Sequence, residues 1–120
     1  MITGEVNADL EATIPIMVRG GNGEERQISA VIDTGFTGYL TLPSAVVTVL
    51  DLEWLNLEDA TLGDGSIHSF DVYRAIVIWD GEAREVEVNL TETEPLIGMA
   101  MLFRYIETVI GGPVRIASLQ

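Results

Sequence analysis

The sequence predicts a mainly β domain, and three observations carry that prediction. Short runs rich in Val, Ile and Leu are separated at close intervals by Gly, Asn and Asp, which are residues of tight turns. The segment 83–90 alternates polar and apolar residues, as a strand with one solvated face does. Asp33 directly follows the apolar run 30–32, which is typical of a strand buried on both faces. A carboxylate in such a place is costly unless a partner or a chemical task keeps it there, so Asp33 is a functional candidate.

We expect a single domain spanning residues 1–120. The chain has 120 residues, of which 48% are apolar, which is enough for one core and too short for two. No linker, repeat or low-complexity segment divides it. It has neither an apolar stretch of the roughly 18 residues that a transmembrane helix needs nor the basic and apolar regions of a signal peptide at its N-terminus. We therefore expect a cytoplasmic protein.

The composition excludes several kinds of chemistry. Without cysteine, the chain has no disulfide, thiolate nucleophile or Cys-ligated zinc site, and without lysine it has no Schiff base and no P-loop. The acidic runs lack the spacing of a calcium loop, so we expect no metal and no cofactor. The formal net charge of −13 comes from 19 acidic residues against six scattered arginines. Such a surface repels phosphate backbones and anionic lipid, so we expect no nucleic-acid or membrane partner.

The first half of the chain predicts a hairpin and a short helix. Strands are expected at 11–18 and 26–32, joined by a glycine-rich turn at 20–23. Pro43 followed by the apolar segment 44–50 favours a short helix, because proline suits the first helical turn. The β-branched residues of that segment leave a strand as the competing interpretation.

The second half predicts two further hairpins around a short strand and a short helix. The first of these hairpins has a glycine-rich tip, Gly63-Asp64-Gly65-Ser66, whose residue types are those of tight turns. The expected segments are strands at 57–62 and 67–79, a turn at 80–82, the alternating strand at 83–90, a short apolar strand at 94–99, one or two helical turns at 100–104, and a last hairpin of 105–110 and 114–116 around a turn at 111–113.

Asp33-Thr34-Gly35 has a sequence context that resembles a known protein family. The triplet follows an apolar strand and precedes a glycine-containing turn, and a second apolar strand later in the chain ends in Leu96-Ile97-Gly98. This order resembles the retroviral-type (retropepsin-like) single-domain aspartic proteases, and the segment 33–43 is similar to their bacterial branch with an Asp-Thr-Gly-Phe-Thr-Gly motif. The resemblance covers almost the whole chain. It implies a retropepsin-like closed antiparallel barrel, the acid protease fold, with one or two short helices.

The resemblance implies an aspartic endopeptidase that is active as a homodimer. Such an enzyme activates water between two carboxylates that share one proton, and this chain has a single Asp-Thr-Gly triplet. Asp33 from each of two copies would then meet on a two-fold axis. The resemblance also implies that the Thr34 hydroxyl bonds across the dimer and that Gly35 supplies a peptide N–H to the carboxylate. We therefore expect Asp33, Thr34 and Gly35 to be catalytic and the substrate to be a peptide or protein in extended conformation.

Substrate contacts are expected at two places. Gly63-Asp64-Gly65-Ser66 would close over a bound peptide as a flap, with an ordinary surface hairpin as the plainer interpretation. Many family members carry Ala or Ser directly after the triplet, where this chain has Phe36, which has no hydroxyl to offer the carboxylate. Thr37 is the nearest substitute. We assign Phe36 to the substrate-binding residues, where it would narrow the cleft, with packing in the core as the alternative.

Two other functions remain open on the sequence. Asp33 as a phosphoryl-accepting nucleophile is disfavoured, because the common phosphatase pattern has a second Asp two positions on, where this chain has Gly35. A protease-like module that binds peptides or dimerises with little or no catalysis is the stronger alternative, since a fold does not prove an activity. Phe36 and the high negative charge both favour this alternative.

Overall fold

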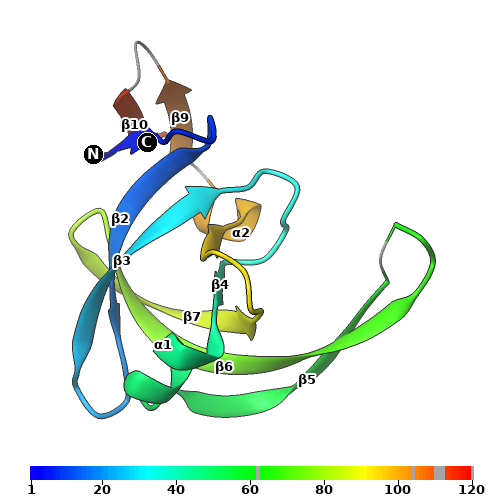
Figure 1. Cartoon of the computed structure of the whole chain (residues 1–120). Helices are drawn as coiled ribbons and strands as arrows, with labels where there is room; N and C mark the ends of the chain where they lie inside the picture. The colour runs from blue at the N-terminus through cyan, green and yellow to red at the C-terminus, as the bar shows by residue number, and fades with distance from the viewer. Residues whose placement is uncertain (62, 104, 110–112, 120) are drawn as a thin grey trace.

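The mainly β fold predicted from the sequence is confirmed (Figure 1). The structure is a computed structural model, and it describes residues 1–61, 63–103, 105–109 and 113–119, with the backbone alone for 106–109. Within these ranges the strands form one continuous sheet, accompanied by two short helices. The strands are β1 (Ile2–Val6), β2 (Ala12–Arg19), β3 (Glu25–Ile32), β4 (Leu40–Leu42), β5 (Glu53–Thr61), β6 (Ile67–Trp79), β7 (Glu82–Leu90), β8 (Leu96–Ile97), β9 (Tyr105–Val109) and β10 (Pro113–Ser118), and the helices are α1 (Ser44–Val49) and α2 (Met99–Leu102).

The sheet closes on itself into a ring. Its central strands run in the order β6, β7, β4, β8, β3, β2, and the segment 17–19 of β2 pairs with 76–78 of β6 to complete the ring. Most neighbouring strands are antiparallel, as expected, whereas β3 with β8 and β4 with β7 form short parallel pairs. Parallel neighbours need long connections, and both pairs do join segments that lie far apart in the sequence.

The interior of the ring is filled by aliphatic side chains. In β7 the buried Val86 and Val88 alternate with the exposed Glu85 and Glu87, which confirms the strand predicted from the alternating pattern. Every strand of the ring contributes side chains to this core. One fully buried residue from each of them is Val18, Ala30, Leu40, Val77, Val88 and Ile97.

Helix α1 follows Pro43, so the helical prediction for this segment is confirmed and the competing strand interpretation is wrong. A carboxylate from another part of the chain caps the helix: Glu92 accepts hydrogen bonds from the Ser44 backbone N–H at 2.6 Å and from the Ser44 hydroxyl at 3.0 Å. An anion at a helix N-terminus satisfies a free N–H group and the helix dipole. Val47 and Leu50 are buried and fix the helix to the core.

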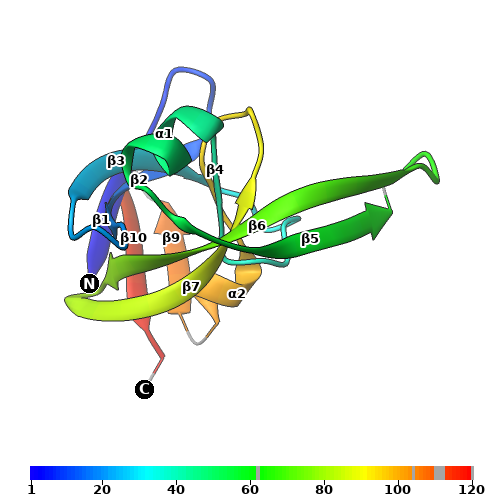
Figure 2. The ribbon, with the colours of Figure 1, turned by 90° about the horizontal axis from the view of Figure 1, so that it is seen from below.

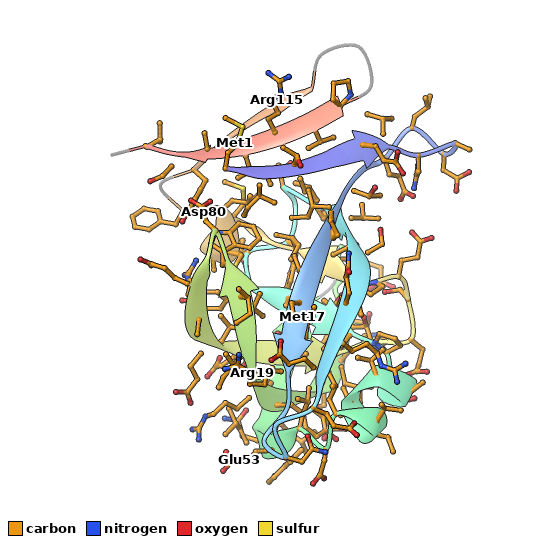
Figure 3. The ribbon with its side chains drawn as sticks, turned by 90° about the vertical axis from the view of Figure 1, so that its left-hand side faces the viewer. Met1, Met17, Arg19, Glu53, Asp80 and Arg115 are labelled. Carbon is orange, nitrogen blue, oxygen red and sulfur yellow. The ribbon has the colours of Figure 1, made fainter. Side chains whose placement is uncertain are left out.

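Strand β1 has no counterpart among the predicted elements. It pairs with β2 on one side and β10 on the other, so the two ends of the chain lie close together (Figure 1). The Met1 amino group lies 2.6 Å from Asp80 Oδ1 in the turn between β6 and β7, which joins this part of the sheet to the ring (Figure 3). The last predicted hairpin is confirmed in β9 and β10. Residues 111–112 of its turn, Leu62 and Arg104 lie outside the described residues.

Strands β5 and β6 extend beyond the ring as a two-stranded arm (Figures 1 and 2). Strand β6 has the predicted bounds, whereas β5 begins at Glu53 rather than at Leu57. A bulge between Trp54 and Asn56 shifts the register near the base of the arm, and bulges bend and twist a strand pair. Most residues of β5 are exposed, so the arm depends mainly on its hydrogen bonds to β6.

The turn between β2 and β3 approaches the end of α1 so closely that glycine is required there. A methyl group on Gly20 would overlap the backbone carbonyl oxygen of Leu50, whereas the nearest atom to a methyl group on Gly21 would lie at 3.8 Å. We predict that Gly20→Ala lowers the free energy of unfolding by about 1–3 kcal/mol, because the backbone must shift. Gly21→Ala is the matched control and should change it by less than about 0.5 kcal/mol. Urea denaturation measures both, and equal effects would contradict this packing.

Candidate active site

Asp33 is the first residue after β3, and the neighbouring strand β8 fixes its backbone. The Asp33 N–H donates to Ile97 O at 2.9 Å, and the Val31 N–H donates to Pro95 O at 2.8 Å. The parallel pairing of β3 with β8 therefore continues up to the acidic residue itself. Asp33 is partly buried. A strand held on both sides thus presents this carboxylate at a defined place.

The Asp33-Thr34-Gly35 triplet forms a tight turn that holds its own carboxylate. The Gly35 N–H donates to Asp33 Oδ1 at 2.9 Å, and the Phe36 N–H donates to Asp33 O at 3.1 Å. Hydrogen bonds from peptide N–H groups to a carboxylate are stronger than those between neutral groups. Thr34 and Gly35 are exposed in the single chain, so the Thr34 hydroxyl is accessible to a second molecule.

The loop that follows the triplet, residues 36–39, is held by the beginning of α2. Three backbone N–H groups of residues 98–100 donate to three carbonyl oxygens of this loop. Because residues 96–97 also form β8, one short segment supports both the strand that carries Asp33 and the loop beyond it. The three bonds are Gly98 N–H to Tyr39 O (3.0 Å), Met99 N–H to Phe36 O (2.7 Å) and Ala100 N–H to Gly38 O (3.1 Å).

Thr41 supports the site and was missed in the sequence. It is buried in β4, and its hydroxyl oxygen accepts a hydrogen bond from the Leu96 N–H at 2.9 Å. Leu40 pairs with Ile97, so β4 holds β8 from the side opposite β3. The one signal in the sequence is a polar residue between Leu40 and Leu42, and alternation alone would place it on a solvated face.

The tip of the arm, residues 63–66, stands apart from Asp33 in the single chain. It lies at the far end of β5 and β6, and the arm curves out on the same side of the ring as the loop after β3 (Figures 1 and 2). The structure therefore brings the expected site residues 33–36 together and leaves the tip separate from them.

Within the tip, Asp64 orders the turn. Asp64 Oδ1 accepts hydrogen bonds from the Ser66 hydroxyl at 2.6 Å and from the Ser66 N–H at 2.9 Å. The hydroxyl, followed by the backbone N–H, lowers the pKa of the Asp64 carboxyl below its ordinary value of 3.8. Gly65 has a φ of 85°, a conformation that favours glycine. The tip is therefore an ordered turn whose acceptor stays ionised in mildly acidic solution.

A groove of about 480 Å³ borders the loop at Tyr39. Arg74 lines this groove and forms ion pairs with Glu53 at 2.8 Å and with Glu85 at 2.5 Å. Arg84 lies over the Tyr39 ring, 5.9 Å from its centroid, and braces the loop from the side of β7. The lining residues are Tyr39, Leu55, Arg74, Glu85, Val86 and Glu87.

The described ranges contain neither a cluster of metal-ligating side chains nor a membrane-spanning helix. Within residues 1–61, 63–103, 105–109 and 113–119, no three Asp, Glu or His residues are grouped so that they could hold a metal ion. Neither helix in the same ranges has the length that a membrane crossing needs.

Two solved structures share this architecture. A retropepsin-like aspartic protease from Rickettsia conorii matches with a TM-score of 0.62 at 18% identity, over 98% of this chain and 91% of that chain. The EIAV protease in complex with the inhibitor HBY-793 matches with a TM-score of 0.58 at 15% identity, over 81% of this chain and 89% of that chain. The chain has the retropepsin-like fold. At these identities the likeness establishes the fold alone, and no family model or curated protein sequence matches the chain.

In this retropepsin-like fold, we predict that the Thr41 hydroxyl is needed to hold β8. Thr41→Val keeps the shape and removes the acceptor of the Leu96 N–H, so the free energy of unfolding should fall by about 1–3 kcal/mol. Thr41→Ser keeps the acceptor and loses one methyl group, which costs about 0.8 kcal/mol. Hydrogen exchange at the Leu96 amide separates the two effects. It should accelerate in Thr41→Val only, and equal protection in both variants would contradict the assigned bond.

The tip predicts a pH dependence. Because the pKa of Asp64 is lowered in the folded chain, its hydrogen bonds are complete above the ordinary value of 3.8 and are lost as the pH falls through the lowered value. Ser66→Ala removes the hydroxyl donor, so the pKa of Asp64 should rise toward its ordinary value. Ser69→Ala is the control, since the Ser69 hydroxyl bonds Asp59 instead. An NMR titration of the Asp64 carboxyl carbon measures the shift, and a curve unchanged by Ser66→Ala would rule out the assigned bond.

Proposed function

We propose that this protein is an aspartic endopeptidase that hydrolyses peptide bonds as a homodimer. One observation carries the proposal: the Gly35 N–H holds the Asp33 carboxylate in a turn directly after β3, whose residues Ala30 and Val31 are buried, in a retropepsin-like fold. Partial burial of an acidic side chain beside the core costs free energy, which a structural role alone does not explain. A task in catalysis accounts for it.

Dimerisation follows from the number of carboxyl groups that the chemistry requires. Among the described residues, the Asp33 carboxylate accepts its hydrogen bond from Gly35 and is bonded to no second carboxyl group. Activation of water by this chemistry needs two carboxyl groups that hold one proton, about 3 Å apart. A two-fold dimer would bring the second Asp33 to the first. The exposed Thr34 hydroxyl beside it would then bond to the partner chain.

The two Asp33 side chains have complementary roles in this mechanism. The ionised one takes a proton from water as the water oxygen attacks the peptide carbonyl carbon, and the protonated one donates a hydrogen bond to the carbonyl oxygen. The tetrahedral intermediate then collapses, the C–N bond breaks, and the leaving nitrogen receives a proton from the pair. The pair gains one proton from water and gives one to nitrogen, so it ends with the single proton with which it began.

The substrate would bind in extended conformation beneath the arm. Gly63-Asp64-Gly65-Ser66 lies at the end of two long strands on the same side of the ring as the Asp33 loop. Backbone groups of the tip would bond the peptide, and movement of the arm would close it over the cleft between the two chains.

A peptide-binding or dimerisation module without efficient catalysis is the second candidate. Strand β5 lies at one end of the sheet order, so its outer edge is open to strand addition by an extended peptide. The net charge of −13 also disfavours ionisation of a carboxyl pair, and the proposed catalysis needs one ionised carboxylate. Such a module would bind peptides and leave them intact at every pH.

The first test of the proposal is cleavage of an unfolded protein or a peptide library. We predict cleavage in mildly acidic solution, at roughly pH 4–6, and loss of nearly all of it in Asp33→Asn without unfolding. Asp51→Asn is the matched control, because Asp51 is exposed and has a φ of 49°, which Asn tolerates. Cleavage that persists in Asp33→Asn would refute the proposal. Peptide binding without cleavage at any pH would favour the binding module.

The second test addresses the homodimer. We predict a species of twice 13.1 kDa in sedimentation. Adding an equal amount of Asp33→Asn chain to a fixed amount of wild type should roughly halve the activity, because about half of the wild-type chains then pair with an inactive partner. Adding the same amount of Asp51→Asn chain should roughly double it. Unchanged activity with the Asp33→Asn chain, or an active 13.1 kDa species, would show that single chains act alone.

A further inference from the structure

The Phe36 side chain packs within the active-site loop itself. A methyl group on Gly38 would lie 2.6 Å from Phe36 Cζ and 2.7 Å from Phe36 Cε1. A methyl group on Gly98 would lie 2.6 Å from Phe36 Cδ2. These separations are shorter than carbon atoms can adopt, so the ring occupies the space that side chains at both positions would need. Phe36 is correspondingly partly buried.

Backbone hydrogen bonds join the same two segments beside the ring. The Met99 N–H donates to Phe36 O at 2.7 Å, and the Ala100 N–H donates to Gly38 O at 3.1 Å. A hydrogen bond in a less polar environment is electrostatically stronger than one in water, and an aromatic ring packed beside it provides such an environment. The ring and the two bonds therefore support one another in holding the loop to the start of α2.

Phe36 is also the last residue of the turn that holds the carboxylate. Its N–H donates to Asp33 O at 3.1 Å, and the residue just before it, Gly35, donates its N–H to Asp33 Oδ1 at 2.9 Å. Because Gly35 is covalently joined to Phe36, the placement of Phe36 determines where the Gly35 N–H points. Packing at Phe36 is thereby coupled to the geometry at the reacting group.

We propose that Phe36 is a positioning residue whose ring, packed on Gly38 and Gly98, holds the Gly35 N–H on the Asp33 carboxylate. This role rests on the proposed function, and it replaces the substrate contact suggested for Phe36 by the sequence. A ring that fills the space over Gly38 in the loop and Gly98 before α2 is poorly placed to enclose a substrate side chain. Gly38 and Gly98 belong to the same chain as Phe36, so this packing needs no second copy.

Gly38→Ala tests the ring separately from the rest of the loop, because the three atoms nearest to a methyl group at Gly38 all belong to Phe36. We predict that Gly38→Ala and Phe36→Ala each accelerate hydrogen exchange at the Met99 and Ala100 amides by at least about tenfold. In the double variant the Gly38 change should add little, since the ring that it would strike is gone. Gly98→Ala is the control, because its methyl group would also meet the Gly38 carbonyl oxygen and so stays disruptive without the ring.

Turnover by the homodimer gives the second readout. Phe36→Ala should lower kcat by about tenfold or more and leave KM within about twofold, and Phe36→Leu, which keeps most of the apolar volume, should recover most of kcat. A change in KM or in residue preference, with exchange at Met99 and Ala100 unchanged, would overturn the proposal in favour of a substrate contact.

Amide exchange and turnover test the positioning role and the proposed function separately. Amide exchange needs no substrate, so unchanged exchange in Phe36→Ala contradicts the positioning role even if the chain cleaves nothing. Accelerated exchange in a chain that cleaves no peptide would support the packing of Phe36 and contradict the proposed function alone.

Discussion

The hydrogen bond from the Asp33 N–H to Ile97 O is the interaction on which the candidate site depends. It is the last bond between β3 and β8, and β8 is only two residues long. Such a short strand holds its place because β4 pairs with it on the other side and the Thr41 hydroxyl accepts the Leu96 N–H. The same segment continues into α2, which bonds the loop after the carboxylate. The packed ring of strands thus fixes the position of one acidic side chain through β8.

Assembly of two such chains works against their charge. Each carries a formal net charge of −13, and exposed charges repel one another over a screening length of about 8 Å at physiological ionic strength. Association in the proposed dimer would therefore have to come from apolar contacts and hydrogen bonds, and the exposed Thr34 hydroxyl would be one donor beside the proposed axis. A proton shared between two Asp33 side chains would remove one negative charge from the centre of the interface. The chemistry proposed for the site and the stability of the dimer are linked in this way.

Most of the fold could be predicted from local sequence patterns. The features that depend on contacts between distant parts of the chain could not. Alternating residues and glycine turns predicted the hairpins, and the triplet around Asp33 predicted the strand end that carries the carboxylate. Strand β1 was missed because its order depends on partners in β2 and β10 rather than on its own pattern. Thr41 was missed because its hydroxyl oxygen bonds the Leu96 N–H, which lies far away in the chain. Phe36 allowed two interpretations for the same reason, since its packing partner Gly98 is equally remote.

A crystal structure of the protein with a non-cleavable peptide, grown in mildly acidic solution, would show whether two chains complete the site. The quantity to measure is the separation of the two Asp33 carboxyl groups across a dimer. We expect a two-fold dimer in which these groups lie about 3 Å apart and the peptide runs extended between them and the arms. A peptide bound to a single chain, or a dimer that keeps the two Asp33 side chains too far apart to share a proton, would contradict it.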